Sequence, residues 1–131
     1  MSGAAERGDT RKRQVLQVRE VLFPALGLVV WAAHFGVSYA ANALACARGF
    51  ADARLLGQPL VPAVIMGLTA VALLALGLVI RASLSGLEGS LEEGGEAEPR
   101  FTRWLAATAA ALAALAVLFQ AVPALSVPPC G

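Results

Sequence analysis

The distribution of apolar residues along the chain is dominated by three long runs. They cover residues 21–46, 59–80 and 104–122, and none of them contains Asp, Glu, Lys or Arg. A helix needs about 20 residues to cross a hydrocarbon core about 30 Å thick. A soluble helix has charges on its outer face, whereas these runs are apolar all the way round. The pattern therefore predicts an all-α membrane protein with three transmembrane helices in a small bundle.

The segments outside the three runs are short and mostly polar. We expect residues 1–20 to form a basic cytoplasmic segment, residues 82–100 a mobile acidic loop, and residues 123–131 a tail that contains prolines and a cysteine. The transmembrane domain itself spans residues 21–122. With 131 residues, of which 58% are hydrophobic, the chain is expected to form one domain with almost nothing outside the bundle.

Basic residues are divided unequally between the two ends of the predicted bundle. Of the ten, eight lie in the N-terminal segment or near the second connection, and two, Arg48 and Arg54, lie in the first connection. Segments rich in Lys and Arg stay on the cytoplasmic side of a membrane. The charges therefore predict a cytoplasmic N-terminus and a periplasmic C-terminus. Because the chain prefers Arg to Lys and is rich in Ala and Gly, as in GC-rich bacteria, we expect it in the bacterial inner membrane.

Both cysteines fall on the predicted outer side. Cys46 ends the first run and Cys130 lies in the C-terminal tail. Disulfides form and persist in the periplasm, so a Cys46–Cys130 bond is a candidate, and closing its loop would contribute on the order of 4 kcal/mol. Two other interpretations stay open: unpaired thiols, and a functional pair that binds copper or exchanges disulfides, although the spacing is not C-x-x-C.

One face of the first run is polar or small. At 100° per residue, five positions share an arc of about 80°: Gly27, Trp31, His34, Ser38 and Asn42. Polar side chains within a membrane usually face protein, and glycine lets helices approach closely. We therefore expect this face to contact another helix of the bundle or a partner subunit. The second and third runs offer matching groups: Thr69, Gln120 and the alanines Ala106, Ala110 and Ala114.

The titratable residues do not combine into a recognisable reactive site. His34 is the only histidine, so a bis-histidine haem site is not expected, and Cys46 lies about 18 Å further along the helix, too far for a shared metal. The runs contain no carboxylate for a proton relay. The sequence thus predicts no catalytic residue, no metal, no cofactor and no enzymatic activity. The expected partners are membrane lipids and either another integral membrane subunit or a second copy of the chain, but no nucleic acid.

Two local patterns are similar to a known family. One is Trp31-x-x-His34-Phe35-x-x-x-Tyr39 followed by Leu44-Ala45-Cys46-Ala47, and the other is Pro123-Ala124-Leu125-x-Val127-Pro128-Pro129-Cys130. Together they resemble the small three-helix inner-membrane proteins of bacteria that accompany caa3-type cytochrome c oxidases. This resemblance spans most of the membrane portion and implies an accessory or assembly role near a terminal oxidase. The missing second histidine argues against binding of the haem itself.

These observations lead to one main functional hypothesis and two alternatives. The main hypothesis is a non-enzymatic accessory or assembly protein of a respiratory complex, with a haem-copper cytochrome oxidase as the candidate. The first alternative is a periplasm-facing thiol or copper-handling factor that uses Cys46 and Cys130. The second is a self-associating small transport component, in which several copies would enclose a path.

Overall fold

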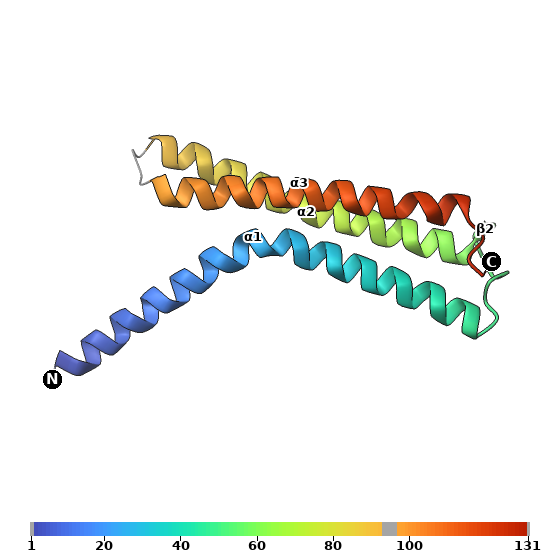
Figure 1. The fold of residues 1–131 in the computed structure, drawn as a ribbon, viewed down its shortest axis with the longest axis horizontal. Coiled ribbons are helices and arrows are strands. Elements are labelled where there is room, and N and C mark those ends of the chain that lie inside the picture. The colour runs from blue at the N-terminus through green and yellow to red at the C-terminus, as the bar shows by residue number, and fades with distance from the viewer. Residues whose placement is uncertain (1, 93–96, 131) are drawn as a thin grey trace.

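Three long helices make up most of the computed structural model, which describes residues 2–92 and 97–130 (Figure 1). They are α1 (Ser2–Ala47), α2 (Leu60–Glu92) and α3 (Ala97–Ser126). Each helix is long and apolar enough to cross a membrane. The three helices predicted from the apolar runs are thereby confirmed.

The helices form a small bundle from which one end of α1 projects. Helix α2 packs against α3, and α1 packs against both. The N-terminal part of α1 leaves the bundle at an angle (Figure 1). Along α1, side chains begin to be covered at Phe23, next to Pro24. A proline inside a helix removes a backbone hydrogen bond and commonly bends the axis, which accounts for the change of direction at this level.

Small residues allow the helices to approach closely in the core. The main cluster joins Ala72 and Leu76 of α2 to Ala110, Ala113 and Val117 of α3. A second cluster, made by Ala45, Val61 and Ile65, lies nearer the C-terminal end of α1. These buried side chains are mostly alanine or β-branched, so contact between the helices depends on close backbone approach rather than on large interlocking side chains.

Helices α1 and α3 approach each other closely at Gly27. A Cβ atom placed at Gly27 would lie 3.0 Å from the Cα atom of Ala110 and 3.1 Å from its backbone nitrogen. Ala110 itself is fully buried. The close approach of the first and third helices that the sequence predicts is therefore confirmed at this glycine.

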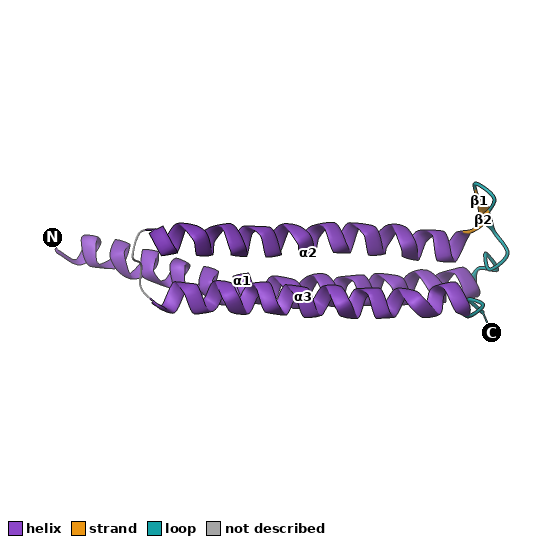
Figure 2. Cartoon of the chain, turned by 90° about the horizontal axis from the view of Figure 1, so that it is seen from above, coloured by secondary structure: helices purple, strands orange, loops and turns teal. Residues whose placement is uncertain are grey.

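The connection between α1 and α2 is more ordered than its composition suggests. The amide of Gly49 donates to the Cys46 carbonyl and that of Phe50 to the Ala45 carbonyl, the bonds of a helix-ending Schellman motif, and Gly49 has the positive φ of 71° that this motif needs. Next come the paired strands β1 (Arg54–Leu55) and β2 (Gln58–Pro59), joined by a turn in which Leu56 and Gly57 both have positive φ. This hairpin lies beyond the N-terminal end of α2 (Figure 2).

The helices extend further than the apolar runs, and the expectation of a long mobile loop over residues 82–100 is wrong for its described part. Helix α2 continues to Glu92 and α3 begins at Ala97, while residues 93–96 lie outside the described residues. Helix α1 similarly begins at Ser2 within the expected basic segment. An apolar run marks only the part of a helix that can lie in hydrocarbon. Glu, Arg and Lys also favour the helical conformation, so a helix can continue past the run into water.

We predict that Gly27→Leu destabilises the bundle, because its side chain meets the backbone of Ala110. The free energy of unfolding, measured by SDS titration in detergent micelles, should fall by roughly 1–3 kcal/mol, the usual cost of overpacking. Gly36→Leu is the matched control, because a Cβ at Gly36 of the same helix meets nothing within 4 Å. Equal stability of the two variants would contradict the close crossing.

Candidate functional site

His34 connects all three helices at the centre of the bundle. Its side chain is 5% exposed. The Nε2 atom lies 3.1 Å from Oγ1 of Thr69 on α2, and Nδ1 lies 3.3 Å from Oε1 of Gln120 on α3. Thr69 and Gln120 are two of the three polar groups that the sequence offers on the other helices, and the third, Thr108, bonds to the Trp104 carbonyl of its own helix.

The directions of these hydrogen bonds follow from the chemistry of the partners. Thr69 donates its hydroxyl proton to the Ile65 carbonyl at 2.8 Å, so its oxygen accepts the Nε2–H of His34. A neutral imidazole has one N–H and one accepting nitrogen, so with Nε2 donating, Nδ1 accepts from the N–H of the Gln120 carboxamide, whose oxygen and nitrogen exchange places on a half-turn. Both ring nitrogens of His34 are thus engaged within the bundle, and this cluster of three residues acts as a polar clamp.

The other aromatic residue of the predicted face packs beside the clamp. Trp31 is half-buried against the main core cluster. Its ring stacks on that of Phe35, with centroids 6.3 Å apart and planes inclined by 19°. Such a pair adds to the apolar contact, so Trp31 contributes to packing within the chain.

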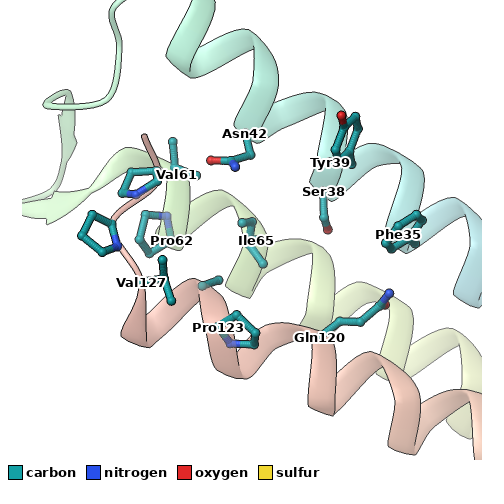
Figure 3. Close-up of a pocket in the computed structure, with 13 residues that line it drawn as sticks. Phe35, Ser38, Tyr39, Asn42, Val61, Pro62, Ile65, Gln120, Pro123 and Val127 are labelled. Carbon is teal, nitrogen blue, oxygen red and sulfur yellow. The ribbon is translucent and has the colours of Figure 1, made fainter. Parts of the chain in front are cut away.

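Ser38 and Asn42 continue the polar face into a cavity between the three helices (Figure 3). The cavity has a volume of about 410 Å³. Helix α2 contributes apolar side chains that include Val61 and Ile65, and α3 contributes Gln120, which links the cavity to the polar clamp. Sequence reasoning placed Ser38 and Asn42 on the correct face but did not predict the cavity.

Two polar atoms in this cavity have no partner. Among the residues that the structure describes, Ser38 Oγ and Asn42 Oδ1 are buried side-chain atoms without a hydrogen-bond partner. A buried polar atom left unpaired costs about 1–3 kcal/mol, so such atoms call for an explanation. The polar face of α1 is therefore divided: His34 is satisfied within the chain, whereas Ser38 and Asn42 are left open.

The C-terminal tail closes one end of the cavity and is linked to α1. Cys46 and Cys130 lie at disulfide-bonding distance, with their Cα atoms 5.7 Å apart. The two prolines before Cys130, Pro128 and Pro129, line the cavity together with Val127. A disulfide was one of the three interpretations of the cysteines that the sequence left open. The bond holds the tail over one end of the cavity, and we call this end of the bundle the disulfide end.

Metal-binding groups do not gather elsewhere in the described part of the chain. No cluster of three or more His, Cys, Asp or Glu residues that could hold a metal ion occurs among the described residues.

Comparison with known proteins adds no relative, since no family model, no curated protein and no solved structure matches the chain. The similarity to oxidase-associated proteins therefore stays a prediction based on the motifs quoted above.

We predict that removing either partner of His34 destabilises the bundle. Thr69→Val and Gln120→Leu should each lower the free energy of unfolding by about 1–2 kcal/mol, because one buried nitrogen of His34 loses its hydrogen bond. SDS titration in micelles would measure the change. Thr108→Val is the matched control, because the Thr108 hydroxyl bonds only to the Trp104 carbonyl of its own helix. If all three variants match the native protein, the polar clamp does not stabilise the fold.

We also predict that the Cys46–Cys130 bond stabilises the protein through the unfolded state. The cysteines are 84 residues apart. Loss of the bond in a double Cys46→Ser, Cys130→Ser variant should lower the free energy of unfolding by on the order of 4 kcal/mol in the chain-entropy model. Treatment of the native protein with dithiothreitol should give the same loss. If reduction releases two thiols without changing stability, this role is contradicted.

Proposed function

We propose that this chain is a non-enzymatic accessory or assembly protein in a respiratory complex of the bacterial inner membrane, with a haem-copper cytochrome oxidase as the candidate partner. It spans the membrane three times with its N-terminus in the cytoplasm and its C-terminus in the periplasm. The support comes from the apolar surface of the bundle, the distribution of charge, and the exposed N-terminal part of α1.

The outer faces of the helices favour an apolar environment. Leu74 and Leu78 of α2 are 70% and 68% exposed, and Phe119 of α3 is 69% exposed. Soluble monomers rarely expose so large a continuous apolar surface. In a bilayer the same side chains contact lipid at no cost, which supports the membrane location.

The fold gathers the basic residues at one end. The N-terminal part of α1, the C-terminal end of α2 and the N-terminal end of α3 all lie opposite the disulfide end (Figure 1). Eight of the ten basic residues belong to these parts of the chain, while Arg48 and Arg54 belong to the other end. By the positive-inside rule this supports a cytoplasmic N-terminus. The same orientation implies that Cys46 and Cys130 face the periplasm, where a disulfide persists.

The observation on which the accessory role mainly depends is the projecting part of α1. Every residue from 3 to 18 is exposed, over a length of about 24 Å at 1.5 Å per residue. This stretch is basic and also exposes Val15, Leu16 and Val18. A helix of this length is only marginally stable in water on its own. We infer that a partner subunit covers it at the cytoplasmic face, which would make the chain one component of a larger complex.

The arrangement of the cysteines favours this role over the alternative of a copper-handling factor. Such a factor needs thiolates, because the thiolate is the metal ligand. Cys46 and Cys130 are instead joined to each other, and their bond fixes the tail on the bundle. The second alternative, self-association into a transport path, is an outcome of the experiment below.

The test is a pull-down of the tagged protein from native membranes in mild detergent, with mass spectrometry of the partners and a visible spectrum of the eluate. We expect oxidase subunits and haem bands. The triple variant Arg11→Gln, Lys12→Gln, Arg13→Gln should recover them at least about fivefold less, since exposed charges contribute up to about 1 kcal/mol each.

The control variant is Arg48→Gln, Arg54→Gln, which removes charge at the disulfide end and should leave recovery unchanged. Immunoblots of the membranes must show equal amounts of all variants. A colourless eluate that contains only further copies of the chain would contradict the accessory role and favour self-association. Co-purification that survives the triple variant would show that the projecting helix binds lipid rather than the partner.

A further inference from the structure

The cavity near the disulfide end has exposed side chains on its rim and reaches a depth within the apolar spans. Ser38 is nine residues before Ala47, the last residue of α1, or about 13 Å along the axis. On the rim, Phe35 and Tyr39 of α1 are 54% and 71% exposed, and Val127 beyond α3 is 59% exposed. With the bundle in a membrane, this rim faces lipid, so a molecule that enters the cavity comes from the bilayer.

The lining limits the charge and size of what can bind. None of the lining residues, all of which belong to the described part of the chain, is an acid or a base. A charged group would therefore be desolvated there without a counter-ion. A volume of about 410 Å³ falls in the range of small-molecule sites. It suits a head group and its first carbons, with the remainder of an apolar chain leaving past the rim.

The unpaired atoms in the cavity define the group that would bind. Other hydroxyls in the described helices donate to the carbonyl four residues earlier, among them those of Thr10, Thr69, Ser83, Thr108 and Ser126. Ser38 does not, although a serine in a helix has this carbonyl within reach. Its hydroxyl instead extends from α1 toward α2 and α3, and Asn42 extends from the same helix (Figure 3).

We propose that this cavity binds the head group of an uncharged membrane amphiphile that has a hydroxyl group. When the two side chains turn into the cavity, the ligand hydroxyl donates to the Asn42 carboxamide oxygen and accepts from, or donates to, Ser38. Its apolar chain passes between Phe35 and Val127 into the bilayer. The inference rests on the membrane insertion proposed above but not on the partner subunit, so a failed pull-down leaves it intact.

The disulfide shapes this site as well as stabilising the chain. Pro128 and Pro129 line the cavity directly before Cys130, whose bond to Cys46 holds them there. Prolines have a fixed φ and little conformational freedom, so the short tail forms a stiff wall on the side of the disulfide end. The ligand therefore enters sideways from the bilayer rather than from the water beyond the tail.

The test uses the full-length oxidised protein in phosphatidylcholine nanodiscs with two photoreactive probes. One is hexadecanol with a diazirine on its chain, and the other is its methyl ether, which keeps the chain but cannot donate a hydrogen bond. Labelled peptides are mapped by mass spectrometry. We expect the alcohol to label the cavity walls, around residues 35–42 and 120–129, at least about fivefold more than the ether, a ratio equivalent to about 1 kcal/mol.

Variants of the cavity provide the second comparison. Ser38→Ala and Asn42→Leu, alone or together, should reduce labelling by the alcohol to the level of the ether. Ser126→Ala is the matched control, because it removes a hydroxyl near the same end of the bundle that does not line the cavity. Equal labelling by alcohol and ether in the native protein would overturn the proposal and show that only lipid chains occupy the groove. This comparison needs no variant to fold.

Competition distinguishes two sources of the hydroxyl. A hydroquinone with an isoprenoid tail and a diacylglycerol both present a hydroxyl on an apolar body. If either one reduces labelling by the alcohol in proportion to its concentration, the site is supported and its ligand class is assigned. If neither competes, the labelling is an effect of the probe alone and the proposal is overturned.

Discussion

The arrangement of the bundle depends on the hydrogen bonds of His34. In an apolar environment helices gain nothing from burying further apolar surface, so polar contacts and close packing must decide how they meet. His34 contacts one hydroxyl on α2 and one carboxamide on α3, and so fixes the rotation of α1 about its axis. Ser38 and Asn42 lie one and two turns further along α1 on the same face, so they must also face the interior of the bundle. The polar clamp thus orients the α1 side of the cavity that lies beyond it.

Close packing complements the clamp at the opposite side. The backbone of α1 approaches α3 at Gly27, against Ala110, and the helices remain joined through the clamp. Beyond it the contact among them is supplied by the small second cluster of Ala45, Val61 and Ile65 and by the covalent link at Cys46. Helices α1 and α3 are in close contact at Gly27, and α1 is linked covalently to the tail at Cys46. The cavity lies between these two levels.

Much of this structure can be predicted from the sequence because it follows from local patterns. The apolar runs predict three helices, and the helical period puts Gly27, His34 and Ser38 on one face. The cavity could not be predicted, because its lining combines three helices with the tail that the Cys46–Cys130 bond holds. The continuation of α2 through Glu92 could not be predicted either, because this stretch lacks the apolar run that marks the spans. The hairpin turn needs a positive φ at Leu56, a residue that rarely adopts it.

The contrast between His34 and its two neighbours on the same face supports the proposal that the cavity binds a ligand. The same chain satisfies its other helical hydroxyls, at Thr69 and Ser83 for example, with carbonyls of their own helices. Leaving Ser38 and Asn42 unpaired costs about 1–3 kcal/mol for each atom, and an alanine or leucine would remove that cost. The bond between Cys46 and Cys130 contributes on the order of 4 kcal/mol, which is enough to offset such a cost. Departures from local rules that are compensated elsewhere in a fold are typical of functional sites.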